Sequence, residues 1–189
     1  MMKIKYIILL ISVVILLKLC TYNSITHLDD KELQWMKSYT EENETLYFCS
    51  KSDTDTMIVK EIEIFNSLNP FIQNEGVSEY KACGDISYEI KHNGSFISGS
   101  FSILKEDNNK PVLLSLILCD RYALNIKYNL VSHRCHNYIY RDCIIVDDNN
   151  SEIGQYQSNN CGINRFVWSK SKGLLNYSFE DGQIYELIE

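Results

Sequence analysis

The sequence predicts a mainly β domain, an antiparallel meander that curls into a bent sheet or small barrel, with one short helix before it and a hydrophobic anchor helix at the N-terminus. Short segments of alternating apolar and polar residues recur from residue 45 onward, bounded by turn residues. Helical patterns are missing between these segments, whereas a parallel α/β sheet needs them. Curling is expected because it removes exposed strand edges.

The first 22 residues predict a signal anchor. Lys3 and Lys5 precede an apolar run over residues 6–17, as in an export signal. No small-x-small cleavage site follows the run, which favours a retained single-pass transmembrane helix whose flanking Lys3, Lys5 and Lys18 reach the lipid–water interface. The positive charge before the run places the rest of the chain on the extracytoplasmic side, in the cell envelope or periplasm.

Cys20 offers a second interpretation of the same segment. It stands where a lipoprotein carries its acylated cysteine, but Lys18 and Leu19 replace the small or uncharged residues of a lipobox. Lipidation of Cys20 is therefore the less favoured alternative. Whether the segment is cleaved, lipidated or retained stays open.

Residues 23–189 are expected to form one extracytoplasmic domain. Their length suits a single core, and only two prolines and no Gly/Ser-rich run interrupt the chain. The formal net charge of -7 argues against nucleic acid, because affinity for phosphate backbones comes from Lys and Arg. The expected partners are the membrane, through the N-terminal segment, and an unknown protein, polymer or hydrophobic ligand.

The helix comes first in the domain. Asp29 or Asp30 can cap a helix that continues through Tyr39 and carries one apolar stripe. Trp35 adjoins this stripe, and we interpret it as a core or edge residue rather than a ligand platform.

Strand patterns fill most of the remaining chain. They lie at residues 45–50, 56–64, 86–90, 96–103, 112–119, 122–130, 138–146, 166–168, 174–179 and 184–188. Asn93-Gly94 marks the clearest hairpin turn. Residues 65–79 follow neither period and predict a long surface loop. Residues 112–119 are almost continuously apolar, which predicts burial on both faces.

Strand-and-turn patterns at both ends of the domain are similar to those of a known group. They are residues 46–50 followed by 55–59, and residues 166–170 followed by 173–175, Tyr177 and Asp181-Gly182. These patterns resemble the first and last hairpins of small exported bacterial lipoproteins of uncharacterised function. The resemblance implies an exported β domain and adds no activity.

Seven cysteines allow disulfides in an exported domain. Cys135, Cys143 and Cys161 are close together in the sequence, so we expect one disulfide within this group. Cys49 and Cys119 lie inside apolar runs and are interpreted as small buried side chains.

The segment around residues 133–143 contains zinc-ligand residue types. Strand alternation directs His133 and Cys135 to one side and His136 to the other, and no C-x-x-C pair accompanies Cys143. We therefore interpret these residues as a surface His-Cys stretch, and no metal or cofactor is expected.

Motifs for hydrolysis and ion binding are weak. Gly94-Ser95 and Gly99-Ser100 lie in a predicted hairpin without the helix that a nucleophile elbow requires. Residues 53–56 lack the glycine of an aspartic-protease motif and predict a turn. Residues 147–152 lack the ligand spacing of an EF-hand. No catalytic residue is assigned, and these weak motifs argue against an enzyme.

Three functions follow from this sequence. The leading hypothesis is a non-enzymatic, membrane-tethered module that binds a protein, a peptide or a surface polymer. The first alternative is a carrier that holds a lipid or another hydrophobic small molecule in a β-barrel cavity. The second alternative is a hydrolase whose site is assembled from residues distant in sequence.

Overall fold

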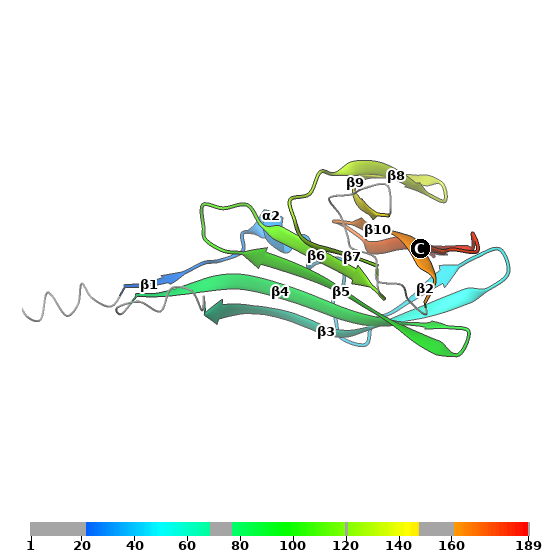
Figure 1. Cartoon of the computed structure of the whole chain (residues 1–189), viewed down its shortest axis with the longest axis horizontal. Helices are drawn as coiled ribbons and strands as arrows, with labels where there is room; N and C mark the ends of the chain where they lie inside the picture. Colours follow the sequence, from blue (N-terminus) through cyan, green and yellow to red (C-terminus); the bar gives the residue numbers. More distant parts are fainter. Residues whose placement is uncertain (1–21, 69–76, 120, 148–160, 189) are drawn as a thin grey trace, which may run out of the picture.

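The computed structural model describes residues 22–68, 77–119, 121–147 and 161–188 (Figure 1). The predicted anchor over residues 1–22, with Lys3, Lys5, Lys18 and Cys20, lies outside these ranges except for Tyr22. Within them, no helix has both the length and the apolar character needed to cross a bilayer.

Strands dominate the described ranges. The elements are β1 (Tyr22–Ile25), α2 (Asp30–Leu33), β2 (Thr45–Cys49), β3 (Thr54–Leu68), β4 (Val77–His92), β5 (Ser95–Lys105), β6 (Leu113–Leu118), β7 (Arg121–Ile126), β8 (Val131–Cys135), β9 (Tyr138–Val146), β10 (Ile163–Ser169), β11 (Gly173–Phe179) and β12 (Ile184–Leu187). The prediction of a mainly β domain is confirmed.

The strands form one curled sheet built from two antiparallel meanders. Strands β2 to β7 are neighbours in chain order, as are β8 to β12, and β12 joins the two meanders by pairing with β2. The sheet bends back on itself, so that β7 contacts both β9 and β10 (Figure 1). The curled antiparallel sheet is therefore as predicted, and the parallel pairing of β1 with the start of β4 is an addition to it.

The helix is shorter than predicted. Asp29 is the N-cap, and its carboxylate accepts hydrogen bonds from the Lys31 and Glu32 amides at 2.9 and 2.8 Å. The helix ends at Leu33, and the chain continues in tighter turns with hydrogen bonds between residues three apart. These turns carry Trp35 into the core. Packing of Trp35 on the sheet therefore decides the conformation of the residues after Leu33, which do not continue the helix.

Several strands differ from the sequence-based boundaries. The predicted loop over residues 65–79 is partly strand, because Phe65 to Leu68 of β3 pair with Cys83 to Tyr80 of β4. β8 lies between two of the predicted strand segments, 122–130 and 138–146, and its exposed side chains are polar or mixed. In β6 every second residue is only half-buried, so that the expected burial on both faces is wrong. The outer face of the curl is more open there than the apolar sequence suggests.

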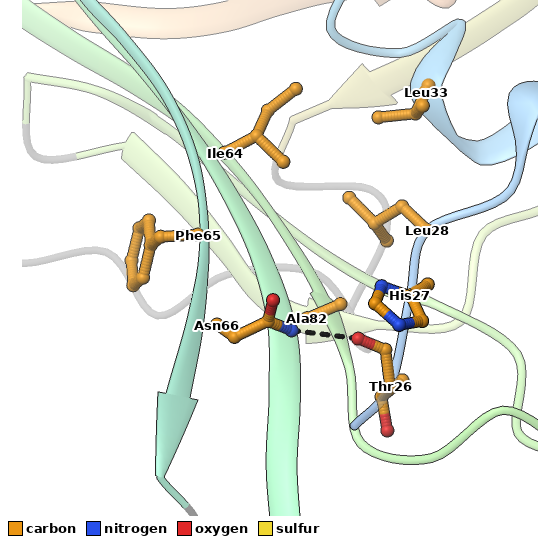
Figure 2. A pocket seen from close by; sticks show the side chains of 8 residues that line it. All are labelled: Thr26, His27, Leu28, Leu33, Ile64, Phe65, Asn66 and Ala82. Atoms are coloured by element: carbon orange, nitrogen blue, oxygen red, sulfur yellow. Dashed lines mark hydrogen bonds between the residues drawn. The ribbon is translucent and has the colours of Figure 1, made fainter.

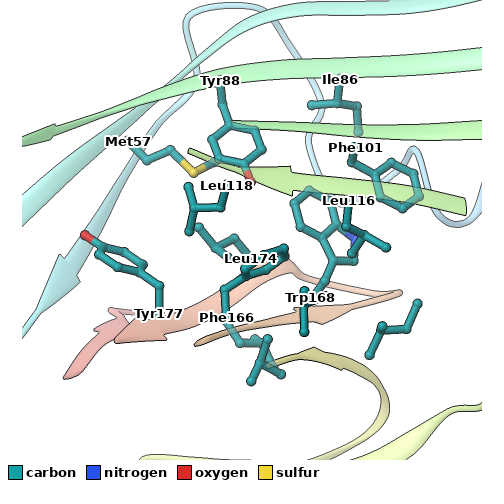
Figure 3. Close-up of a cluster of buried hydrophobic side chains, with 14 of the residues drawn as sticks. Met57, Ile86, Tyr88, Phe101, Leu116, Leu118, Phe166, Trp168, Leu174 and Tyr177 are labelled. Atoms are coloured by element: carbon teal, nitrogen blue, oxygen red, sulfur yellow. The ribbon is translucent and has the colours of Figure 1, made fainter. Parts of the chain in front are cut away.

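Aromatic side chains fill the inside of the curl. Trp168 of β10 stacks on Phe101 of β5 with ring centroids 4.9 Å apart (Figure 3). The Phe101 ring in turn stacks on Trp35, with centroids 5.8 Å apart. Tyr88 of β4 also contacts Trp168. All four side chains are buried, so residues from both meanders share one core. The expectation that Trp35 is a core residue is confirmed.

One disulfide joins the two meanders. Cys119 follows β6, Cys161 precedes β10, and their sulfurs are bonded. The expected pair within Cys135, Cys143 and Cys161 is wrong, because Cys161 takes a partner from outside the group and the other two keep their thiols. Proximity in the sequence does not decide the pairing here, because the curl brings together residues 42 positions apart.

Removing this disulfide should destabilise the domain by about 4 kcal/mol, the loss of loop-closure entropy for a closed loop of this length. The measurement is urea unfolding of the full chain in which both Cys119 and Cys161 are changed to serine. The matched control is Cys49→Ser, a half-buried thiol outside the bond. Equal unfolding midpoints for the double variant and the control would show that the disulfide contributes nothing to stability.

Candidate functional site

The second half of β3 is an open edge of the sheet. β3 pairs with β4 along its length, but β2 covers only residues 54–58 on its other side. Among the residues that the structure describes, no strand pairs with that other side of residues 61–68. Alternate backbone N–H and C=O groups of this segment therefore face away from the sheet. We call residues 61–68 the open edge.

A β-bulge decides which side chains of the open edge face inward. The register with β4 shifts between Val59 and Glu61. Beyond the shift, Ile62 lies opposite Ile86 and Ile64 lies opposite Gly84, on the same face as the core. Without the bulge this alternation would be reversed, because each strand position changes face. Ile64 is 58% exposed, which is unusual for an apolar residue on the inner face.

Residues 26–40 form a wall opposite the open edge, and an apolar groove lies between them. One pocket of about 320 Å³ is lined by Leu33, Met36, Lys37, Tyr39, Thr40, Ile62 and Ile64. A second pocket of about 190 Å³ is lined by Thr26, His27, Leu28, Leu33, Ile64, Phe65, Asn66 and Ala82. The pockets share Leu33 and Ile64 and are therefore adjacent. Figure 2 shows Leu28 and Leu33 facing Ile64 across the second pocket. We call the two pockets together the β3 groove.

Specific polar contacts hold the wall of the β3 groove. The Asn66 side-chain amide donates to the Thr26 carbonyl at 2.7 Å (Figure 2), and the buried Lys105 ammonium lies 2.8 Å from the Glu32 carboxylate. The Tyr39 hydroxyl accepts a hydrogen bond from the Leu174 amide at 2.9 Å. The groove is thus built before any ligand arrives, which lowers the entropic cost of binding.

Acidic side chains lie along the outer face of the open edge. Glu61 and Glu63 are exposed there, and Asp85 of β4 is opposite Glu63. Lys60 lies 2.8 Å from Glu89 and is neutralised by it. Within the described ranges, neither Glu61 nor Glu63 makes a salt bridge. Over residues 61–64 the edge is therefore apolar on its inner face and negative on its outer face, and the exposed Phe65 follows on the outer face.

A buried polar cluster lies elsewhere in the sheet. The Asp55 carboxylate of β3 accepts hydrogen bonds from the Tyr177 hydroxyl of β11 and from His92 Nδ1 of β4, the latter at 2.8 Å. The His92 ring stacks on Phe179 at 4.5 Å. Burial, and secondarily the hydrogen bond to Asp55, holds the pKa of Tyr177 far above its usual range.

This Asp–His pair is the arrangement by which a hydrolase would be recognised, so its surroundings matter. The second ring nitrogen of His92 lies 3.0 Å from the Asn93 side-chain amide. In the described part of the chain no serine, threonine or cysteine is within hydrogen-bond distance of the ring. The cluster ties β3 and β4 to β11. The prediction that residues 53–56 are only a turn is wrong for Asp55, which is buried.

The cysteines expected to pair have separate partners. The Cys135 thiol donates to the Leu175 carbonyl at 3.7 Å, and the Cys143 thiol donates to the Tyr140 carbonyl at 3.8 Å. Burial raises the pKa of the Cys143 thiol to about 11. Cys143 is therefore an unreactive core thiol at neutral pH.

The histidines of the same segment also diverge. His133 Nε2 lies 2.7 Å from the Asn176 side-chain amide, and burial lowers the pKa of His133. His136 bonds the Leu187 carbonyl at 3.1 Å and lies 3.3 Å from Glu186. Nowhere in the described ranges do three His, Cys, Asp or Glu side chains gather as metal ligands would.

Neither the open edge nor the Asp55 cluster can be predicted from the sequence. Glu61-Ile62-Glu63-Ile64 showed alternation, but alternation does not reveal that the strand has a neighbour on one side only. Asp55 and Tyr177 are 122 positions apart, so no local pattern connects them. Gly94, in contrast, lies at φ +80° in the β4–β5 turn, as Asn93-Gly94 predicted.

The chain matches no protein-family model, no curated protein and no solved structure. The similarity of its terminal hairpins to small exported lipoproteins therefore stays a prediction. The predicted membrane tether does too, because it lies outside the described residues.

Proposed function

We propose that the protein is a membrane-tethered extracytoplasmic binding module that holds an extended peptide segment of a partner protein along the open edge of β3. The observation that carries the proposal is the open edge beside the β3 groove. An added strand would complete the backbone hydrogen bonds of residues 61–68 and place its inward side chains over Ile62 and Ile64.

An exposed apolar edge favours strand addition because its unpaired backbone groups can pair with another chain. Soluble proteins blunt such edges with lysines, prolines, inward-pointing charges or bulges. The single bulge lies before residue 61, and the edge beyond it carries Ile64 and Phe65, which are 58% and 40% exposed. The eight residues of the open edge are about as long as an ordinary strand, so a peptide can pair along them as one added strand.

Two observations support export of the domain. The apolar run over residues 6–17 follows two lysines, as in a signal anchor. The disulfide between Cys119 and Cys161 is of a kind that persists in oxidising compartments. Both fit a tether in the membrane and a domain outside the cytoplasm.

The carrier hypothesis has less support. Trp35, Phe101 and Trp168 occupy the inside of the curl, where a barrel-type carrier would hold its ligand. The β3 groove lies outside this aromatic core and has the open edge along one side, which suits an extended chain better than a compact lipid.

Strand addition can be tested with the full chain in nanodiscs of zwitterionic lipid. The probe is a fluorescent peptide of alternating valine and threonine, about nine residues long. We expect the fluorescence anisotropy of this peptide to rise as it binds. A second peptide, in which alternate backbone nitrogens are methylated, should not bind, because methylation removes the N–H groups that donate hydrogen bonds to β3. Ile64→Lys should weaken peptide binding at least about tenfold, since it puts a charge next to the inward apolar side chains of the added strand.

The matched control is Phe96→Lys. The exposed fraction of Phe96, 61%, is close to that of Ile64, but Phe96 lies on β5 away from the open edge. Hydrogen exchange should slow on peptide binding at residues 61–68. Equal binding of the methylated peptide, or equal weakening by the two lysine variants, would show that the edge is not where the peptide binds.

A further inference from the structure

We infer that the open edge selects a segment in which apolar side chains alternate with lysine or arginine. The inference rests on the proposed function and adds the chemistry of the ligand. It follows from the two faces of the edge, which differ in character: the inner face has the β3 groove, and the outer face has Glu61 and Glu63.

The β3 groove specifies the inward positions. In an added strand every second side chain points to the inner face, and such side chains are about 7 Å apart. The two pockets of the groove follow one another along β3, the larger over Ile62 and Ile64, the smaller over Ile64 and Asn66. Two successive inward side chains therefore have a pocket each. The apolar lining favours valine, leucine, isoleucine or methionine there.

The acidic face specifies the positions between them. Outward side chains of the added strand would lie beside Glu61 and Glu63, at the distance of cross-strand neighbours. Opposite charges attract at that distance and like charges repel. Because Lys60 is already bound to Glu89, it does not offset the two carboxylates. Asp85 on the neighbouring strand adds to the negative charge.

The same charges disfavour a second copy of this chain as the occupant. Antiparallel pairing of two open edges about Ile64 would put the acidic residues of both copies on one face of the joined sheet, with Glu63 of each copy diagonally next to Glu63 of the other. The whole chain also has a net charge of -7, so that two copies repel at longer range. A basic and apolar segment of a different protein meets neither obstacle.

The experiment compares three fluorescent peptides of about nine residues on the full chain in zwitterionic nanodiscs. They alternate valine with lysine, with threonine or with glutamate. We expect the lysine peptide to bind about tenfold more tightly than the threonine peptide at low salt, and the glutamate peptide more weakly than either. The preference should shrink as salt is raised.

Two protein variants test whether the carboxylates are the cause. E61Q/E63Q should bind the lysine and threonine peptides equally, and E61K/E63K should prefer the glutamate peptide. Both positions are exposed, so the variants should fold like the parent. Hydrogen exchange of residues 61–68 reports for each variant that the edge is the binding site.

The outcomes separate the inference from the proposed function. If all three peptides bind equally, but their backbone-methylated forms do not, the selection for basic residues is refuted and strand addition stands. If no peptide shows a loss on methylation, strand addition itself is refuted. If the chain dimerises through residues 61–68 without any peptide, a second copy is the occupant and the inference is wrong.

Discussion

Replacing Asp55 with alanine should lower the free energy of unfolding by about 3 to 5 kcal/mol, because it removes a buried carboxylate that accepts two hydrogen bonds, each worth about 1.5 to 3 kcal/mol. Asp55 is 1% exposed and serves two donors, the Tyr177 hydroxyl and His92 Nδ1. Its loss leaves a buried hydroxyl and a buried ring N–H without their acceptor. Urea unfolding of the full chain, followed by the fluorescence of its two tryptophans, measures the change.

Two controls assign this effect to the cluster. Asp53→Ala removes an exposed carboxylate two positions away, in the β2–β3 turn, and should cost less than about 1 kcal/mol. Tyr177→Phe removes one donor only and should cost about 1 to 2 kcal/mol. If Asp55→Ala is no more destabilising than Asp53→Ala, the cluster does not hold β3 and β4 to β11. In the double variant of Asp55 and Tyr177 the effects should be less than additive.

The domain should also lose stability steeply above about pH 10. Burial raises the pKa of Tyr39, Tyr88 and Tyr177 above the ordinary value of 10.0. Between the unfolded and folded pKa values the unfolded chain has lost these protons and the native protein keeps them. The stability contributed by these hydroxyls is therefore complete below about pH 10 and declines as the pH rises. Each tyrosine contributes a slope of about 1.4 kcal/mol per pH unit, so the three together give about 4.

Urea unfolding at a series of pH values from about 8 to 11 tests this slope. Tyr88→Phe should reduce it by about a third, because a phenylalanine at this position has no proton to lose. Phenolate absorbance should show the buried tyrosines ionising together with unfolding. If all tyrosines ionise near pH 10 while the protein stays folded, the three hydroxyls are not protected as the structure implies.

The two large effects belong to residues that the sequence analysis did not single out as important. Asp55 was placed in a turn, and Tyr177 was part of a strand pattern at the other end of the chain. Their contact depends on β12 pairing with β2, which brings β11 close to β3 and β4. A pairing between β2 near the start of the domain and β12 near its end leaves no local pattern, because it is decided by the packing of the whole core.

The cysteines are a second case in which the sequence does not reveal a contact between distant residues. The seven cysteines, together with the predicted export, favoured a disulfide, and the structure contains one between Cys119 and Cys161. The choice of partner was wrong, because it relied on proximity in the sequence. The actual pair joins the two meanders where the sheet curls toward itself.

The open edge of β3 is the clearest case of a feature that only the tertiary structure decides. For the residues that the structure describes, the sequence alone predicts most of the strands, most of their turns and the lack of helices between the strands, because alternation, Asn-Gly turns and the N-cap at Asp29 act over a few residues. The tertiary structure decided that β2 covers only residues 54–58, that a bulge turns Ile62 and Ile64 inward, and that residues 26–40 stand across from them. These features depend on strand length, register and packing between distant segments, which no local pattern specifies.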